Sequence, residues 1–235
     1  MNINKKYISS SSRRKARSIS PEKMRLMVEY FPEIAIKSPN SMLGLEISEV
    51  LVKSHEYKNI CLEIGFGDGE HLINQAENNP ENLYFASELF YNSICSTTLK
   101  IYNKKLKNIR IFDGDTRYFL ESLAFLRSEI LSKIYVLFPD PWPKEKHSKR
   151  RLINKVTLDL LNKTLKKDGE VIIASDKEVY INWCLEIFKN DERFILSNEL
   201  ETQKPHTGYI TTKYHSKAIE EGREARFLFY KKKRD

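Results

Sequence analysis

The alternation of short apolar runs with longer amphipathic stretches, from residue 58 onward, constrains the fold more than any other feature of the sequence. Five runs rich in β-branched and aromatic residues predict strands that are buried on both faces, at 59–65, 83–88, 109–114, 133–138 and 170–175. Amphipathic stretches predict helices near 69–78, 90–105, 116–131, 152–167 and 177–189, the fourth ending with an Asp168-Gly169 cap. Five successive β–α units predict a parallel sheet with helices on both faces.

Two further strand-like runs, 194–200 and 225–232, are joined by a polar loop at 201–223. Because no helical crossover separates them, they are expected to pair antiparallel at one edge of the sheet. The prediction is therefore an α/β fold with a mostly parallel, seven-stranded sheet and an antiparallel edge strand. A chain of 235 residues suits one such domain with a short extension.

The first 40 residues form a basic extension that precedes a main domain at 41–235. The net charge is +8, and residues 1–30 carry eight Lys or Arg against two Glu. Such clustered charge is typical of a phosphate-binding arm, although a transit peptide or a disordered tail can have the same composition. Ser20 followed by Pro21 predicts a short helix at the end of this arm, because Ser caps helices and Pro suits their first position.

Some classes of protein are disfavoured by what the sequence lacks. There is no apolar run of about 18 residues and no apolar segment after the N-terminus, so neither a membrane span nor a secretion signal is expected. Cys61, Cys95 and Cys184 are widely spaced in apolar surroundings, without a CxxC motif or a Cys/His cluster. They are expected to be reduced core thiols, and no metal site is predicted.

A glycine-rich turn after the first predicted strand is a candidate cofactor site. In LEIGFGDGEH, Glu63 ends the strand and Gly65, Gly67 and Gly69 lead into a helix, which lets the backbone approach a ligand closely. Glu70 stands where the dinucleotide fingerprint GxGxxG needs its third glycine, and this disfavours a nicotinamide cofactor. An ordinary turn between strand and helix is the alternative.

Acidic residues follow the first three predicted strands, whose carboxyl ends meet at one edge of the sheet. Glu88 lies about 20 residues beyond the turn, where a carboxylate can accept both ribose hydroxyls of an adenosine ligand, or can simply be solvated. Asp115 would lie near the adenine, or would cap the helix that starts at Thr116. Since Glu63 also faces the site, this acidic rim suits cationic S-adenosylmethionine better than a diphosphate.

The fourth predicted strand leads into FPDPWPKEKHSKRR, residues 138–151, at the same edge of the sheet. The prolines restrict the backbone, so Asp140 and Trp142 should be held rigidly, the ring to stack on a planar base and the carboxylate to accept N–H groups. A rigid turn whose aspartate caps the backbone is the alternative. The basic residues that follow suit RNA phosphates or a solvated face: Lys144, Lys146, Lys149, Arg150 and Arg151.

Together these motifs resemble those of the tRNA (guanine-N7-)-methyltransferase family along nearly the whole chain. The similar segments are RRKARSISPEKM, LEIGFGDG, FPDPWPKEKHSKRRL, SDKEVY and TTKYHSKAIEEG. The resemblance implies a Rossmann-like class I methyltransferase fold over residues 41–235. It also implies methyl transfer from S-adenosylmethionine to N7 of guanine, expected at position 46 in the variable loop of tRNA, giving S-adenosylhomocysteine and 7-methylguanosine.

The resemblance further implies roles for residues at matching positions. Those implied to hold the cofactor are Glu63, Gly65, Gly67, Glu88, Asp115 and Asp140, with Asp140 also the catalytic residue. Those implied to contact the substrate are Lys144, Asp176, Thr212, Lys213, Tyr214 and His215, while Lys146, Lys149, Arg150 and Arg151 would face the RNA. tRNA is the implied partner, with no metal, no membrane and no obligatory protein partner, and a bacterial-type cytoplasmic location is expected.

Two positions depart from the family pattern. The second strand ends in Ala-Ser-Glu rather than Gly-Ile-Glu, which keeps the Glu88 carboxylate for the ribose. His215 replaces the glutamate of the TxYE motif, a natural acceptor for guanine's N–H groups, so Asp140 or Asp176 is left to carry that recognition. Asp176 is alternatively the cap of the helix predicted at 177–189.

Guanine N7 carries an in-plane lone pair and no proton, so methylation there needs no general base and depends mainly on positioning. We expect Asp140 to offset the positive charge that the transfer brings to the base. Two other functions share part of this sequence pattern. A methyltransferase of an exocyclic amine would also use an Asp-Pro-aromatic turn, and a non-catalytic RNA-binding protein would keep the basic segment without using a cofactor.

Overall fold

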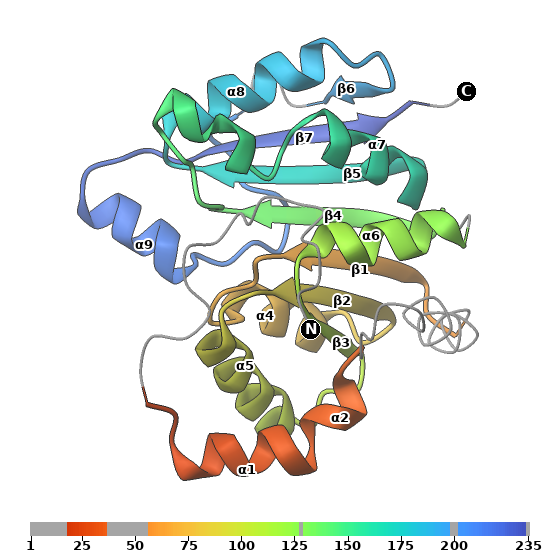
Figure 1. Ribbon diagram of the computed structural model, residues 1–235, viewed down its shortest axis with the longest axis vertical. Coiled ribbons are helices and arrows are strands. Elements are labelled where there is room, and N and C mark those ends of the chain that lie inside the picture. Colours follow the sequence, from red (N-terminus) through yellow and green to blue (C-terminus); the bar gives the residue numbers. More distant parts are fainter. Residues whose placement is uncertain (1–17, 37–55, 127–128, 198–201, 234–235) are drawn as a thin grey trace.

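The computed structural model describes residues 18–36, 56–126, 129–197 and 202–233, in which a seven-stranded sheet has the order β3-β2-β1-β4-β5-β7-β6 (Figure 1). The strands are β1 (Asn59–Ile64), β2 (Asn82–Glu88), β3 (Ile109–Asp113), β4 (Leu131–Leu137), β5 (Leu165–Ser175), β6 (Phe194–Leu196) and β7 (Arg226–Lys232). The first five are mutually parallel, whereas β7 is antiparallel to both of its neighbours. The mostly parallel sheet with an antiparallel edge is therefore confirmed.

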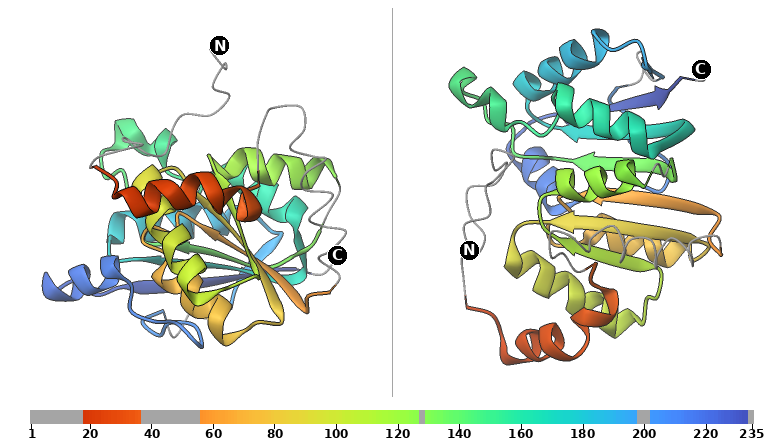
Figure 2. Two further views of the ribbon diagram at one scale, coloured as in Figure 1. Left: turned by 90° about the horizontal axis from the view of Figure 1, so that it is seen from below. Right: turned by 45° about the vertical axis from the view of Figure 1, so that its right-hand side comes forward.

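Helices cover both faces of this sheet (Figures 1 and 2). One face packs against α6 (Thr116–Phe125), α7 (Lys155–Thr164) and α8 (Glu178–Lys189), and the other against α4 (Glu70–Asn78), α5 (Tyr91–Lys104) and the short α2 (Phe31–Ile34). Alternate residues of β1 enter the two layers: Ile60, Leu62 and Ile64 face the first, and Cys61 faces the second. This two-sided burial explains why the strands are almost continuously apolar.

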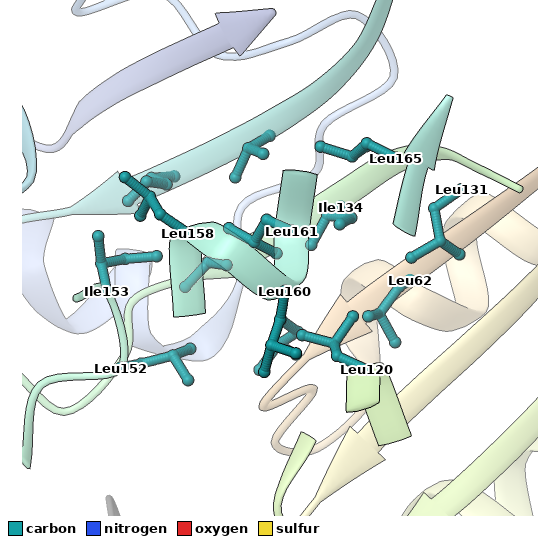
Figure 3. Close-up of a cluster of buried hydrophobic side chains, with 14 of the residues drawn as sticks. Leu62, Leu120, Leu131, Ile134, Leu152, Ile153, Leu158, Leu160, Leu161 and Leu165 are labelled. Atoms are coloured by element: carbon teal, nitrogen blue, oxygen red, sulfur yellow. The ribbon is translucent and has the colours of Figure 1, made fainter. Parts of the chain in front are cut away.

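Figure 3 shows the core between the sheet and α7, where Leu161 of α7 and Leu120 of α6 belong to one cluster with Leu62 of β1 and Ile134 of β4. All four side chains are fully buried. Burial of a leucine or isoleucine side chain contributes about 1.5–3 kcal/mol. Replacement by alanine also leaves a cavity, so each of these positions is worth about 2–5 kcal/mol. This core fixes the strands from whose ends the candidate site is built.

The helix predicted at the end of the basic arm is present as α1 (Pro21–Glu29). The Ser20 hydroxyl accepts a hydrogen bond from the Lys23 N–H, and Pro21 occupies the first turn, as the sequence indicates. α1 packs on α5, where Lys23 Nζ donates to Ser96 Oγ at 2.7 Å (Figure 1). Residues 1–17, with six of the eight basic residues of the arm, lie outside the described residues.

The prediction for the fourth helix is wrong at its C-terminal end. α7 stops at Thr164, and Asp168-Gly169 lies inside β5 rather than at a helix cap. Asp168 is left-handed with φ of 62°, and the pairing of β5 with β4 shifts register at this point. A Cβ on Gly169 would lie 2.9 Å from the Lys166 carbonyl oxygen, so only glycine fits without a shift. The Asp-Gly pair therefore marks an irregularity within a strand.

The polar loop predicted at 201–223 contains a helix, α9 (Lys213–Glu220). Thr212 caps it, because its hydroxyl accepts a hydrogen bond from the His215 N–H at 3.3 Å. Of the eight residues of α9 only Ala218 is buried, which leaves too little apolar periodicity to recognise in the sequence. α9 lies at the end of the sheet toward which the β4 and β5 arrows point (Figure 1).

The described segments contain no helix that is both long and apolar enough to cross a membrane. Cys61, Cys95 and Cys184 are buried and form no disulfide, as their apolar surroundings predict. Burial raises the pKa of Cys61 to about 12, so this thiol stays protonated and unreactive.

Candidate active site

A cavity of about 320 Å³ lies at the carboxyl ends of the central parallel strands. Its lining joins the end of β1 with that of β4, where the strand order changes direction and where open α/β sheets bind ligands. The predicted site residues that line it are Gly65, Gly67, Glu88, Asp115, Asp140 and Tyr214. Five of the six residues predicted to hold a cofactor thus surround one space, and Glu63 is the exception.

The glycine turn after β1 adopts a backbone that other residues rarely take. Gly65, Gly67 and Gly69 all have positive φ, of 73°, 53° and 73°. A Cβ on Gly69 would lie 2.5 Å from Thr97 Oγ1 of α5, so this glycine also permits the start of α4 to pack closely against α5. The turn therefore lines the cavity with backbone at Gly65 and Gly67, where no side chain stands between the chain and a ligand.

Glu88, at the end of β2, is fixed by the turn itself. Its Oε2 accepts the Gly67 N–H at 2.9 Å, and its Oε1 accepts the N–H groups of Leu89 and Phe90 at 2.7 and 2.9 Å. Burial raises the pKa of Glu88, although these three hydrogen bonds favour the carboxylate. Oε1 already accepts two hydrogen bonds, so the acceptor direction that remains for a ligand hydroxyl is on Oε2.

Asp115 has both of the roles that the sequence left open. It caps α6, accepting the Arg117 N–H at 3.1 Å, and it also lines the cavity. Arg117 Nε donates to the same carboxylate at 2.9 Å, and the arginine is only 3% exposed. This buried pair holds the acid rigidly at the cavity wall.

The turn after β4 carries Asp140 on a constrained backbone. Phe138 and Trp142 have positive φ, of 51° and 40°, which is uncommon for residues with bulky side chains. The Phe138 N–H donates to the Ala174 carbonyl of β5 at 2.8 Å, which anchors the start of the turn. Asp140 is exposed at the cavity rim, yet neighbouring atoms remove part of its hydration, and this desolvation raises the pKa of its carboxyl group.

The basic residues after this turn divide into two groups. Lys144, Lys146 and Lys149 are exposed along the 3-10 helix η1 (Glu145–Arg150), and the Arg150 guanidinium lies 4.7 Å above the centre of the Trp142 ring. This end of the turn therefore combines free positive charge with a partly exposed aromatic ring.

Arg151, which was predicted to face the RNA, is almost entirely buried, with only 2% of it exposed. Its Nη2 donates to the Trp142 carbonyl oxygen at 3.1 Å, and its guanidinium lies 4.7 Å above the Trp183 ring of α8. Trp183 is held in turn by a hydrogen bond from its Nε1 to the Ile153 carbonyl oxygen at 2.7 Å. Arg151 therefore anchors the turn to the helix layer instead of facing phosphate.

The residues predicted to contact substrate from the C-terminal part of the chain lie at the start of α9. Lys213 Nζ donates to Asp68 at 3.0 Å, while Tyr214 lines the cavity next to Gly67. His215 turns toward the β4 end, where its ring stacks on Phe138 with a centroid separation of 5.3 Å. Thr212 to His215 are therefore brought to the cavity side of the molecule by the helix that the sequence pattern did not reveal.

His215 packs within a cluster of aromatic side chains and is not presented toward the cavity as an acceptor for guanine N–H groups. Its Nδ1 lies 2.9 Å from the Tyr209 hydroxyl, and its ring meets the Phe227 ring edge-on. Desolvation lowers the pKa of His215, so the ring is neutral at pH 7.

The alternative prediction that Asp176 caps the following helix is wrong. α8 begins after Lys177, and no side chain caps it. Its Oδ2 instead accepts from Arg223 Nε at 2.5 Å and pairs with Lys177 at 3.1 Å. Partial burial alone would raise the pKa of Asp176, but these hydrogen bonds outweigh burial and lower it. Asp176 and Lys144 lie outside the lining of the cavity.

A protein family described as "Putative methyltransferase" matches residues 57–228 of this chain, the segment that builds the sheet and the cavity. The chain belongs to this methyltransferase family. Among its relatives, the tRNA (guanine-N(7)-)-methyltransferase of Rhizobium johnstonii is 38% identical over 177 residues, covering 74% of this chain and 75% of that protein. The family resemblance read from the sequence motifs is confirmed by this similarity.

A second relative is longer than this chain. The bifunctional methyltransferase of Rickettsia typhi is 33% identical over 228 residues, which cover 97% of this chain and 40% of that protein. Among solved structures, the 16S rRNA methyltransferase KamB superposes with a TM-score of 0.57 over 80% of this chain and 94% of that one, at 13% identity. At that identity the likeness concerns the fold, and it confirms the predicted class I methyltransferase architecture.

The partners of the predicted acids were not predicted from the sequence. Glu63, expected to face a cationic ligand, is 3% exposed, and its Oε2 lies 2.7 Å from His71 Nδ1. His71, Arg117 and Arg223 each bind one of the predicted acids, yet none stands in a recognisable motif. The fold brings each of these residues to its acid. The sequence therefore signalled only the acids themselves, by their positions after predicted strands.

Proposed function

We propose that the protein transfers a methyl group from S-adenosylmethionine to N7 of a guanine in tRNA and so forms 7-methylguanosine. The observation that carries this proposal is the single cavity that joins the glycine turn, Glu88 and Asp140 beside an exposed basic segment. The name of the Rhizobium johnstonii relative supports the same reaction. Position 46 of the variable loop remains the target expected from the family motifs.

The residues around the cavity fit S-adenosylmethionine. Glu88 would accept the ribose hydroxyls, the turn at Gly65 and Gly67 would lie against the ligand, and Asp115 would lie at the adenine side. A rim with acids at positions 88, 115 and 140 favours a cation over a diphosphate. When bound, this cofactor supplies a methyl group attached to a positively charged sulfur.

Asp140 is the residue to which we assign the catalytic role. It stands at the open rim, where a base entering from solvent would meet the cavity. Because guanine N7 has a lone pair and no proton, no general base is required. The Asp140 carboxylate would instead stabilise positive charge that develops on the base, and rigid presentation by the Phe138–Trp142 turn would keep the charge in place.

The basic segment after the turn would hold the RNA. Lys144, Lys146 and Lys149 are exposed and suited to phosphate contacts, while Trp142 beneath Arg150 offers a ring for stacking. tRNA as the partner and a cytoplasmic location are parts of the same proposal. The match to the Rickettsia typhi protein covers 40% of its length, so a second activity of that protein is not carried over.

A methyltransferase of an exocyclic base amine is the second candidate, because the exposed Asp140 carboxylate could accept hydrogens from such an amine. To distinguish methylation of N7 from methylation of an amine, the protein is incubated with methyl-labelled S-adenosylmethionine and an unmodified tRNA transcript. The RNA is then digested to nucleosides. Labelled 7-methylguanosine supports the proposal, and a labelled N-methylated amine supports the alternative. Bound tRNA without labelled product would instead indicate a non-catalytic RNA-binding protein.

A further inference from the structure

The segment 202–212, which leads into α9, is attached to α4, the helix that follows the glycine turn. Gln75 Nε2 donates to the Gly208 carbonyl oxygen at 2.7 Å. Gly208 has a positive φ of 77°, and a Cβ there would lie 3.3 Å from the same Nε2 atom. The backbone of the segment thus lies so close to α4 that a side chain at position 208 would crowd Gln75.

A chain of hydrogen bonds that begins in the core provides a second attachment. Glu63 Oε2 lies 2.7 Å from His71 Nδ1, and His71 Nε2 lies 3.1 Å from Nε2 of His206 in the segment. His206 Nδ1 then lies 3.0 Å from the Thr207 carbonyl oxygen. Tyr135 of β4 packs edge-on against His71 with ring centroids 4.8 Å apart, and His71 is 1% exposed. The chain therefore runs from the core of β1 to the segment.

The hydrogen bonds fix where the protons are. A carbonyl oxygen only accepts, so His206 Nδ1 must carry a hydrogen. Desolvation lowers the pKa of His206 to about 4, so its ring is neutral and its Nε2 is an acceptor. His71 Nε2 must then donate to His206, and one further hydrogen lies between His71 Nδ1 and Glu63 Oε2. Each of these contacts therefore joins a donor to an acceptor, as polar groups away from water require.

The same side of α4 also holds the first residue of α9. The Lys213 N–H donates to Glu70 Oε2 at 2.6 Å, and Lys213 Nζ donates to Asp68 Oδ2 at 3.0 Å. Tyr214 comes next and lines the cavity, where its Cε2 would lie 3.4 Å from a Cβ on Gly67. Movement of the segment would therefore move Tyr214 relative to the glycine turn.

We propose that Glu63, His71 and His206 are positioning residues that clamp the 202–212 segment to α4 and so hold Tyr214 against the glycine turn. Glu63 then acts on the cofactor site through the two histidines rather than by facing the ligand. The effect on ligand affinity rests on the proposed function, whereas the clamp itself is a property of the free protein.

The clamp is tested first without ligand, by hydrogen–deuterium exchange of segment 206–216. His206→Leu removes the acceptor for His71, whereas His206→Gln keeps an oxygen that can accept the same hydrogen. We expect faster exchange at Lys213 and His215, whose N–H groups are hydrogen-bonded, in His206→Leu and near wild-type exchange in His206→Gln. Unchanged exchange in His206→Leu would overturn the clamp whether or not the protein binds the cofactor.

The second measurement is calorimetric affinity for S-adenosylhomocysteine. His206→Leu should weaken binding about tenfold, an effect within the usual range for coupled neighbours. If the clamp acts through Tyr214, the double variant His206→Leu/Tyr214→Ala should bind no more weakly than Tyr214→Ala alone. Additive losses would contradict action through Tyr214. Absence of wild-type binding would contradict the proposed cofactor, while the exchange measurement would still decide the clamp.

Discussion

Asp140 is the residue whose charge matters most for the proposed reaction, because it is exposed at the rim while Glu88 and Asp115 are held deeper by backbone N–H groups and Arg117. Asp140→Asn keeps the shape of the side chain and removes its charge. We expect turnover under saturating conditions to fall about 100-fold, as when one electrostatic contact to a transition state is lost. Single-turnover kinetics at saturating cofactor and tRNA should show this fall in rate separately from any loss of affinity.

The matched control is Glu145→Gln, which removes an exposed acid from the neighbouring η1 helix and should leave turnover unchanged. Full turnover in Asp140→Asn would refute the catalytic assignment.

The pH dependence of turnover should show the protonation of Asp140. Desolvation raises the pKa of this carboxyl group above its ordinary value of 3.8, so it takes up a proton at a higher pH than an exposed aspartate does. Protonation removes the negative charge, and turnover at saturating cofactor should therefore decline as pH falls through the raised pKa. A pH profile should show this acid limb in the wild type and not in Asp140→Asn. An identical limb in both would assign it to another group.

Adjacent arginines in the basic segment should respond differently to mutation. Arg151→Met removes the buried guanidinium that donates from Nε and Nη2 to the Trp142 carbonyl oxygen, and it should lower the free energy of unfolding by about 1–3 kcal/mol. Arg150→Ala removes a partly exposed group and should change stability by less than about 0.5 kcal/mol. Urea denaturation of the two variants measures this difference. Equal stability losses would show that Arg151 does not anchor the turn.

The helix η1 should act as an RNA-binding element, since Lys149 and Arg150 extend from it beside the cavity turn. Lys149→Ala with Arg150→Ala should weaken tRNA binding and reduce the slope of log affinity against log salt by about two, about one for each lost phosphate contact. Cofactor affinity should stay constant. Lys163→Ala with Lys189→Ala removes the same charge from the far ends of α7 and α8 and serves as the control. An unchanged slope in the η1 variant would contradict its role.

The elements that sequence patterns predicted well are those with strong apolar periodicity. β1 to β4 and α4, α5 and α8 were placed within about two residues because both sheet faces are buried. β5 begins earlier than predicted, at Leu165 rather than at 170, and α6 ends at Phe125 rather than at 131. α9 buries only Ala218 and was predicted as loop. The end of α7 was misplaced because Asp168-Gly169, a common helix-stop signal, serves here as a kink within β5. Such features depend on packing rather than on local preference.

At the scale of the whole molecule, the parallel sheet explains why much of the site was predictable. Parallel strands place their carboxyl ends at one edge, so Glu88, Asp115 and Asp140 meet although they lie far apart in the sequence. The pairing of Glu63 with His71 and the burial of Arg151 depend on the 202–212 segment and on α8. No spacing in the sequence encodes those contacts, and a charged residue is usually exposed.

The central claim is methyl transfer to guanine N7, and replacing that one atom tests it most directly. Two tRNA transcripts would be compared, one with guanine in the variable loop and one with 7-deazaguanine there, in which a C–H group replaces N7 and the amino group remains. With methyl-labelled S-adenosylmethionine, we predict label in the first transcript at that nucleotide and none in the second. Equal labelling of that nucleotide in both transcripts would contradict transfer to N7 and would indicate another atom of the base.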